Sequence, residues 1–373
     1  MKKIGSPLNY DLNLSSAYYF DDLQELKNYY SSKYKNIRYA RDSNSSSLNL
    51  EKYFSSLYQN SHSLSFSSGM SAIASSLCGI SDLNSQIITF GNFYRKSRSI
   101  IEYLNKHFKI KILNFVDYKV FIKWSKKNKL KKNIIFFLEI PSNPFLKIID
   151  IQDIRNRFKN SKIITDLSFA GINNDKDVFK YSDILIFSLT KYVNGHNDAL
   201  GGQLVIKNKK IYDKIWNYRS TFGGIIDPLS AYLTTRSLKT HDLRLKKMLI
   251  NTDSVLKLLK SMKKIDRIWY PGKFENSNQS IRLNNFFKHG GSVITFKTKS
   301  KNSIKLINKM KTIKMAPSFG SIDTLIEWPF YMSYYKQPKK TLKQLNISQD
   351  LIRLSVGCED IDLICNDLKL FNK

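Results

Sequence analysis

The chain has 373 residues, 42% of them apolar and 13% aromatic, which is enough for one large folded domain and a smaller one and excludes a disordered chain. No run approaches the roughly 18 uncharged apolar residues of a membrane span, and no apolar segment follows the basic residues of Met1–Pro7, so neither membrane insertion nor a signal peptide is expected. The net charge of +31 arises mainly from 49 lysines spread along the whole chain, which predicts weak attachment to polyanions without specific nucleic-acid binding.

The three cysteines point to the same cellular environment. Cys78, Cys358 and Cys365 are far apart in the sequence or lack the short spacing of metal ligands. We therefore expect reduced thiols, no bound metal and a cytoplasmic location.

The first 210 residues divide into an arm and an α/β region. Residues 1–60 show little periodicity before the helical spacing of Leu48–Phe54, and we interpret them as an N-terminal arm leading into a helix. From residue 62 onward, short apolar runs alternate with helical stretches, which predicts a mostly parallel sheet covered by helices. The predicted strands are Ile87–Phe90, Ile110–Phe115, Ile134–Leu138, Ile163–Thr165 and Asp183–Phe187.

The remainder of the chain predicts a smaller α+β domain. A long helical stretch runs from about Pro228 to Lys264, and strands are expected at Ser292–Phe296 and Leu351–Gly357 before a final amphipathic helix. We place the arm at residues 1–60, the large domain at 61–240 and the C-terminal domain at 241–373.

Ser188-Leu189-Thr190-Lys191 is the most informative segment. It places a lysine after an apolar run, between two hydroxyl residues and a turn of small and polar residues. A lysine that forms a Schiff base beside a bound phosphate needs such neighbours. Asp166 ends the preceding run, where it could keep a pyridine nitrogen protonated. Together these residues favour pyridoxal 5'-phosphate as cofactor, although an aspartate at a strand end is by itself more often a turn residue.

A phosphate site is indicated near residue 68. Ser67-Ser68-Gly69-Met70-Ser71 precedes a helix-prone segment, so backbone N–H groups and the helix dipole would favour an anion there. Taken alone, this segment could equally be an ordinary helix cap.

These motifs, in this order, resemble the Cys/Met-metabolism family of pyridoxal-phosphate enzymes along essentially the whole chain. The segments that carry the resemblance are Tyr39–Asn44, Ser68–Met70, Glu139–Pro144, Asp166, Ser188–Lys191, Gly195–Gly202 and Arg353–Gly357. The resemblance implies the type I fold of these enzymes, in which a large, mostly parallel α/β domain carries a smaller α+β domain. It also implies a homo-oligomer, most simply a dimer of dimers.

The resemblance also assigns roles to individual residues. Lys191 is the Schiff-base lysine and general base, and Tyr94 stacks on the cofactor ring and is a candidate proton shuttle. The other cofactor-binding residues are Tyr39 and Arg41 from the neighbouring subunit, Ser68, Gly69, Met70, Asn143, Asp166, Ser188 and Thr190. Arg353 and Ser318 would bind the substrate's α-carboxylate.

Some variants resemble plant-type cystathionine γ-synthases, among them Tyr94-Arg95-Lys96-Ser97-Arg98 and Ala316-Pro317-Ser318-Phe319-Gly320. They imply replacement of the γ-substituent of O-phospho-, O-succinyl- or O-acetylhomoserine by cysteine to give cystathionine, a step of methionine biosynthesis. We expect Lys96, together with Arg95, to bind the acidic leaving group. Alternatively, both are ordinary surface positions of a basic protein. Leu167, where the family has a smaller residue, is expected to bring an apolar side chain near the cofactor ring.

Two other functions remain open. The same scaffold could cleave C–S bonds as a cystathionine β- or γ-lyase or a methionine γ-lyase. A basic, non-catalytic binding protein on a retired enzyme fold is the alternative of another class. The residues that the chemistry requires argue against this last possibility, because Lys191, Asp166, Tyr94 and the substrate-binding Arg353 are all retained.

Overall fold

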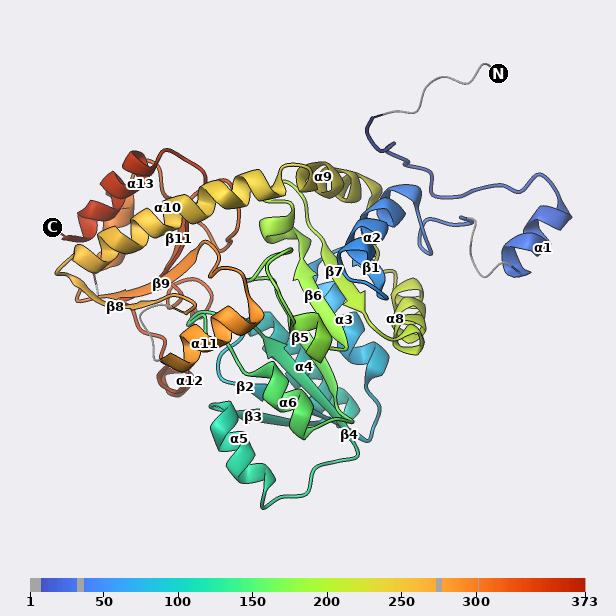
Figure 1. Cartoon of the computed structure of the whole chain (residues 1–373), viewed down its shortest axis with the longest axis horizontal. Coiled ribbons are helices and arrows are strands. Elements are labelled where there is room, and N and C mark those ends of the chain that lie inside the picture. The colour runs from blue at the N-terminus through green and yellow to red at the C-terminus, as the bar shows by residue number, and fades with distance from the viewer. Residues whose placement is uncertain (1–7, 32–36, 273–276, 301, 373) are drawn as a thin grey trace.

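A computed structural model describes residues 8–31, 37–272, 277–300 and 302–372 of the chain, in which two sheets form a large and a smaller region (Figure 1). The basic segment at residues 1–7, considered above as a signal peptide, lies outside the described residues. Within these ranges, none of the helices combines the length and the apolar character that a membrane span requires. All three cysteines are free.

The larger sheet has the strand order β1-β7-β6-β5-β4-β2-β3. The strands from β3 to β6 in this order are parallel, whereas β7 is antiparallel to both β6 and β1. The sheet is therefore mostly parallel, as predicted. Its strands are β1 (His62–Phe66), β2 (Ser85–Phe90), β3 (Lys111–Phe115), β4 (Asn133–Glu139), β5 (Lys162–Asp166), β6 (Ile184–Ser188) and β7 (Gly202–Ile206).

Helices cover both faces of this sheet, which explains why its central strands are continuous apolar runs. In β4, Phe136 and Leu138 face one hydrophobic core, while Ile135 and Phe137 face the other. The first core is closed by α2 (Ser45–Leu57), α5 (Tyr118–Ser125), α6 (Ile151–Arg157), α7 (Val178–Tyr181) and α9 (Pro228–Leu238). The second is closed by α3 (Gly69–Ile80), α4 (Arg95–Phe108) and α8 (Lys209–Phe222).

The smaller sheet has the order β10-β11-β12-β9-β8 and its own core, which contains the fully buried Trp328. Its strands are β8 (Ile265–Trp269), β9 (Val293–Thr298), β10 (Lys314–Met315), β11 (Leu325–Glu327) and β12 (Leu351–Ser355). The helical elements of this region are α10 (His241–Ser261), η2 (Ser303–Lys309), α12 (Lys339–Gln344), α13 (Ile361–Leu368) and η3 (Lys369–Asn372), whereas α11 (Ser277–Phe286) packs against the core of the large sheet.

The single helical stretch expected from Pro228 to Lys264 is two helices. Asp227 caps α9, whose first residue is Pro228, and α10 begins only at His241. Between them, Thr240 has the non-helical dihedrals φ −116° and ψ 7°. The apolar periodicity continues across this break, so the sequence pattern could not reveal it.

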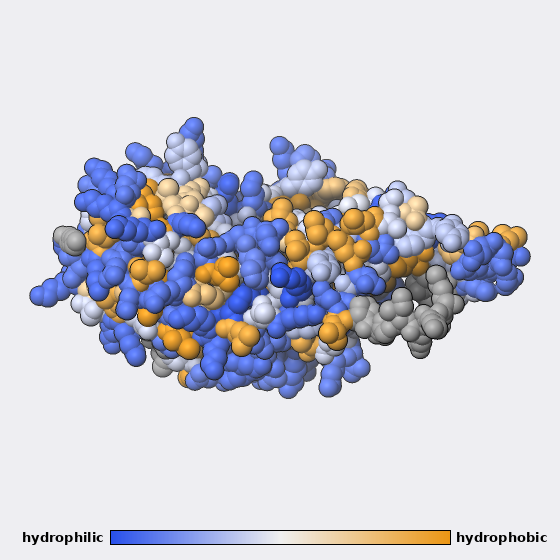
Figure 2. All heavy atoms as spheres, turned by 90° about the horizontal axis from the view of Figure 1, so that it is seen from above, coloured by the Kyte–Doolittle hydropathy of each residue, from blue (hydrophilic) through white to orange (hydrophobic). Residues whose placement is uncertain are grey.

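The N-terminal arm reaches away from both sheets as far as α1 (Leu23–Ser31), and the chain then returns toward the large sheet (Figure 1). A bridge between Ala17 and Tyr39 pairs the outgoing and returning segments. Apolar side chains remain exposed along the arm: Leu8, Leu12, Leu14, Tyr19 and Leu23. Seen from above, apolar residues lie both on the arm and between the arm and the body (Figure 2).

Candidate active site

Neighbouring strands of the large sheet end in polar residues at one edge. Glu139 and Asp166 are register partners at the ends of β4 and β5, and Ser188 ends β6. The turn η1 (Leu189–Val193), which carries Lys191, follows β6 directly. Ligands of open α/β sheets bind beyond the carboxyl ends of the strands. The structure therefore brings the predicted residues Asp166, Ser188 and Lys191 together at the carboxyl ends of the parallel strands, where a ligand would bind.

Lys191 lies in surroundings that favour its neutral form. Its φ of −93° and ψ of −132° depart from helical values within η1. The Nζ atom donates a hydrogen bond of 2.9 Å to Ser318 Oγ from the smaller region. Burial and, to a smaller extent, the Arg353 guanidinium lower the pKa of the amine to about 8, although Glu327 opposes this shift. Such an amine can accept a proton near neutral pH.

Asp166 is a buried carboxylate with hydroxyl and amide neighbours. Only 4% of the residue is exposed, and Oδ1 accepts a 2.9 Å hydrogen bond from the Ser168 N–H. Burial raises the pKa of this carboxyl, while hydrogen bonds from Ser168 oppose the increase. Among the residues that the structure describes, no cationic side chain forms an ion pair with Asp166. A positively charged ligand atom beside Asp166 would offset the cost of burying this carboxylate.

Leu167 differs from its expected position. Its side chain is fully buried in the hydrophobic core between the large sheet and helices such as α2 and α6. Successive residues of an extended segment point to opposite sides. Leu167 therefore packs on the face of the sheet opposite to Asp166, which argues against the expected position near the cofactor ring.

Three of the predicted phosphate-binding residues, Ser68, Gly69 and Met70, lie at the N-terminus of α3, and Ser188 approaches them closely. Ser68 caps this helix by accepting a 3.1 Å hydrogen bond from the Ser71 N–H. A Cβ atom at Gly69 would lie only 3.2 Å from the Cβ and Oγ atoms of Ser188, so glycine permits the close approach of the two segments. Thr190 Oγ1 accepts a 3.2 Å hydrogen bond from the Gly201 N–H. Met70 packs against the core beneath.

Arg353 projects from β12 beside these groups and is 5% exposed. Its cross-strand partner on β11 is Glu327, and the two side chains form an ion pair. The guanidinium also donates hydrogen bonds of 3.3 Å to Asn143 Oδ1 and to the Ser318 carbonyl oxygen. These contacts orient a planar cation of the kind that binds carboxylates with two hydrogen bonds.

Sequence reasoning did not single out four residues of this site, which are Glu139, Phe169, Phe319 and Glu327. The rings of Phe169 and Phe319 stack with centroids 4.0 Å apart and planes 15° apart. Lys191 Nζ lies 5.0 Å from the Phe319 centroid. Glu139 and Phe319 lie in the same sequence motifs as the predicted residues Asn143 and Ser318. This closeness in sequence was the one indication that they belong to the site.

A cleft of about 380 Å³ opens beside the site. It is lined by Tyr94, Arg95, Lys96, Pro317, Met332 and Ser333. Tyr94 precedes the first turn of α4, which contains Arg95 and Lys96, and burial raises the pKa of its hydroxyl. The cleft thus has two basic residues in its lining, as the prediction for Lys96 requires.

Tyr39 and Arg41 remain apart from the other predicted residues. The Arg41 guanidinium lies 5.1 Å from the centroid of the Tyr39 ring, and 42% of Tyr39 is exposed. Within the described part of the chain, no hydrogen bond or ion pair joins either residue to Lys191 or Asp166. Their predicted contact with the cofactor of a neighbouring subunit stays a prediction.

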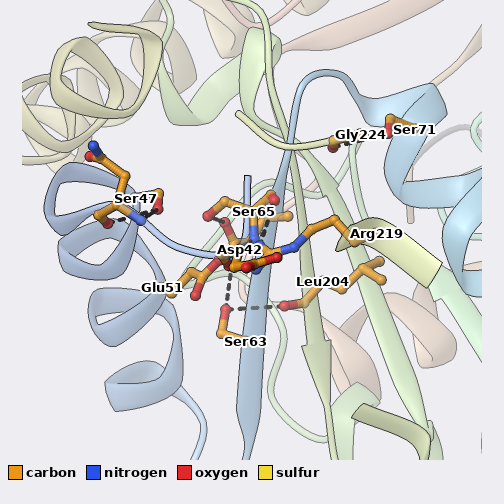
Figure 3. A network of polar contacts seen from close by, with 11 residues as sticks. Asp42, Ser47, Glu51, Ser63, Ser65, Ser71, Leu204, Arg219 and Gly224 are labelled. Carbon is orange, nitrogen blue, oxygen red and sulfur yellow. Dashed lines mark hydrogen bonds and ion pairs between the residues drawn. The ribbon is translucent and has the colours of Figure 1, made fainter. Parts of the chain in front are cut away.

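The segment that carries Tyr39 and Arg41 is held by a buried polar network (Figure 3). Arg219 of α8 donates hydrogen bonds to Glu51 Oε1 (2.7 Å), the Ser65 carbonyl oxygen (2.9 Å) and the Asp42 carbonyl oxygen (3.2 Å). Ser220 also contacts the Asp42 carboxylate. One helix thereby fixes the base of the arm against β1.

The chemistry of this edge fits pyridoxal phosphate. Lys191 is a mostly buried amine whose pKa is lowered to about 8, and Asp166 is a carboxylate suited to a protonated ring nitrogen. The N-terminus of α3, with glycine at its first position, suits a phosphate. The residues predicted to hold the cofactor are thus compatible with it, and their individual roles remain predictions.

Comparison with solved structures identifies the fold. The chain resembles cystathionine γ-synthase from Xanthomonas oryzae pv. oryzae in complex with aminoacrylate and cysteine, with a TM-score of 0.87, 22% identity and coverage of 98% of this chain and 92% of the other. A structure of cystathionine γ-lyase from Lactobacillus plantarum complexed with L-serine gives a TM-score of 0.86 with 27% identity, covering 97% and 92% of the two chains. The fold is therefore the type I fold of pyridoxal-phosphate enzymes, as predicted.

Sequence comparisons agree but include different activities. L-methionine γ-lyase from Fusobacterium nucleatum subsp. polymorphum is 29% identical over 99% of this chain and 94% of its own length. Cystathionine γ-synthase 1, chloroplastic, from Arabidopsis thaliana is 28% identical over 95% of this chain, which spans 63% of that protein. The family described as Cys/Met metabolism PLP-dependent enzyme matches residues 6–370. The chain therefore belongs to this family of pyridoxal-phosphate-dependent trans-sulfuration enzymes.

Proposed function

We propose that the protein catalyses γ-replacement on an activated homoserine with cysteine, giving cystathionine in methionine biosynthesis. The observation that carries this proposal is the cleft beside Tyr94, where Arg95 and Lys96 supply positive charge next to the site. A phosphoryl or succinyl leaving group is acidic and would be attracted by these side chains. The similarity to the Arabidopsis γ-synthase supports the same reaction.

The residues of the site divide the work of this reaction. Arg353 and Ser318 would bind the α-carboxylate of the substrate, and Lys191 would remove a proton from Cα and then one from Cβ. The bond from Cγ to the leaving group then breaks, the cysteine sulfur forms a bond to Cγ, and protons return to Cβ and Cα to give cystathionine. Pyridoxal phosphate, when bound, supplies a protonated ring that draws electrons from Cα. Asp166 would hold the ring nitrogen, Tyr94 would contact the ring, and Lys96 would bind the leaving group.

C–S bond cleavage is the second candidate function, because the relatives also include L-methionine γ-lyase and cystathionine lyases. Product analysis with and without cysteine separates the two candidates. An activated homoserine and cysteine should give cystathionine. Release of pyruvate or 2-oxobutyrate together with a free thiol from cystathionine or methionine, without the synthetic reaction, would instead identify a lyase.

Replacement of Lys96 tests the substrate proposal directly. In Lys96→Ala, KM for O-phosphohomoserine or O-succinylhomoserine should increase by about tenfold or more, because one ionic hydrogen bond is lost. The neutral O-acetyl ester should be affected less. Lys106→Ala, at the exposed end of the same helix α4, is the matched control. Unchanged KM values for all three esters would contradict the proposed role of Lys96.

We also propose that the enzyme is a cytoplasmic homo-oligomer, a dimer of dimers, in which the arm contributes Tyr39 and Arg41 to a neighbouring site. The exposed apolar side chains of the arm support this arrangement, since they would be covered by a second copy. Sedimentation of the full chain, compared with a chain that starts at residue 37, tests it. A monomeric full chain would contradict the proposal.

A further inference from the structure

Glu139 is a buried carboxylate that the proposed mechanism does not use. It ends β4 with 5% of its surface exposed, directly beside Asp166 at the end of β5. Oε2 accepts a 2.9 Å hydrogen bond from the Tyr94 N–H, and Oε1 accepts a 2.7 Å bond from the Asn143 N–H. A single carboxylate therefore ties together the loops that follow β2 and β4.

Both loops carry residues predicted to contact the cofactor. Tyr94 is expected to stack on the ring, and Asn143 to lie near its phenolic oxygen. Because the bonds to Glu139 involve backbone groups, they fix the positions of the two loops and leave the Tyr94 and Asn143 side chains available for other contacts. The Asn143 side chain in turn accepts a hydrogen bond from Arg353.

The charge of Glu139 is unfavourable at this position. Burial, followed by the negative charge of Asp166, raises the pKa of the Glu139 carboxyl, whereas the two N–H donors and Arg353 lower it. The titratable groups facing Glu139 are Asp166 on β5, Arg353 on β12, Tyr94 before α4 and Tyr334 after β11. These effects raise the pKa of Glu139 to about 8, so the carboxyl would carry its full charge near neutral pH only when a cation beside Asp166 offsets the two neighbouring negative charges. Asp166 is where a protonated ring would bind.

We propose that Glu139 is a positioning residue that holds the Tyr94 and Asn143 loops at the ring and adds a second negative charge favouring a protonated ring nitrogen at Asp166. This inference rests on the cofactor placement proposed above. It predicts that the loss of affinity on replacing Glu139 depends on whether the ligand has a ring nitrogen. A residue that only held the two loops in place would not produce this dependence.

The experiment compares pyridoxal phosphate with its 1-deaza analogue, in which carbon replaces the ring nitrogen. Both are titrated into cofactor-free protein and followed by absorbance. The wild type should bind pyridoxal phosphate more tightly. In Glu139→Gln this preference should fall by about tenfold, which corresponds to one pKa unit at the ring nitrogen. Glu139→Asp retains the charge, but its side chain is too short to reach both N–H groups. The affinities for both ligands should therefore fall equally, and the preference for pyridoxal phosphate over the deaza analogue should remain.

Asp367→Asn is the matched control. Asp367 is another buried carboxylate that accepts backbone hydrogen bonds, from Lys311, Thr312 and Ile313, but it lies in the smaller region. Its replacement should lower stability without changing either affinity. Wild-type affinities in Glu139→Gln, or equal loss of both ligands, would overturn the proposal.

Two further outcomes are distinguishable. If Glu139→Gln does not fold, Glu139→Asp decides, and wild-type affinities in that variant would overturn the positioning role. If the wild type itself binds no pyridoxal phosphate, the cofactor placement is wrong and so is the proposed function. If the wild type binds it and only the expected effects of the Glu139 variants are missing, the proposed function still holds.

Discussion

The Lys191 amine gives the folded chain a characteristic dependence on pH. Its pKa is about 8 in the folded protein, compared with an ordinary value of 10.5, because it is largely buried and lies near Arg353. Between these two values the unfolded chain binds a proton that the folded chain has released. Stability contributed by this group therefore increases as the pH rises through the interval.

We predict that Lys191→Met reduces this increase in the cofactor-free protein. The free energy of unfolding, measured in urea at pH 8 and near pH 10.5, should rise by about 2–3 kcal/mol less than in the wild type. Lys106→Met, at an exposed position of α4, is the control and should behave as the wild type. An identical pH dependence in Lys191→Met would show that the folded protein does not lower the pKa of this amine.

At the residue scale, the sequence allowed prediction of groups whose chemistry is unusual for their position. Lys191 and Asp166 stand at the ends of apolar runs, where charge needs an explanation. Glu327 gave no comparable signal, because its partner Arg353 is adjacent only through the pairing of β11 with β12. The stacking of Phe169 on Phe319 likewise depends on the packing of the two regions.

At the scale of elements, the turn that carries Lys191 depends on Gly195 and Arg244. Gly195 has a φ of +71°, and its N–H donates a 2.8 Å hydrogen bond to the Lys191 carbonyl oxygen. The Arg244 guanidinium donates to the carbonyl oxygens of Tyr192, Val193 and Ser237. A Cβ atom at Gly195 would overlap Arg244 Nη1, so the guanidinium would have to leave these acceptors.

We predict that Gly195→Ala is more destabilising than Gly223→Ala. Gly223 has nearly the same φ, +72°, but a Cβ atom there would meet no other atom within 4 Å, so alanine costs only about 1 kcal/mol of backbone strain. Gly195→Ala should cost about 2 kcal/mol more, through the displaced Arg244. Urea unfolding of both variants provides the comparison, and equal losses would mean that Arg244 does not stabilise the turn.

Longer buried apolar runs were predictable as strands, whereas the short apolar run at residues 204–206 in β7 and the serine-containing strand β1 were missed. Ile134–Leu138 was predicted and lies in β4, because strands covered on both faces are continuously apolar. β1 and β7 were not among the predicted strands. In β1, Ser63 and Ser65 are buried because their hydroxyl groups bond to Leu204 and Gln203 of β7. Such compensation depends on a strand distant in sequence and leaves no local pattern.

At the scale of the whole molecule, the net charge of +31 produces self-repulsion in the compact state. We predict that the melting temperature rises when the ionic strength increases from about 0.01 M to about 0.15 M, since the Debye length falls from about 30 Å to about 8 Å. Calorimetry at fixed protein and cofactor concentrations would measure this change. A melting temperature that falls or stays constant would indicate that charge repulsion does not limit stability.

Helix α8 has a further consequence through the two attachments at its carboxyl end. Arg219 and Ser220 hold the base of the arm, and the Gly224 carbonyl oxygen, just beyond the helix, accepts hydrogen bonds from the Ser67 N–H and the Ser71 hydroxyl. Each residue turns a helix by about 100°. Insertion or deletion of one residue between the two attachments would therefore rotate one out of phase with the other. The number of residues between Arg219 and Gly224 therefore sets the base of the arm and the N-terminus of α3 relative to each other, and we expect this length to tolerate less change than the exposed side chains of the helix.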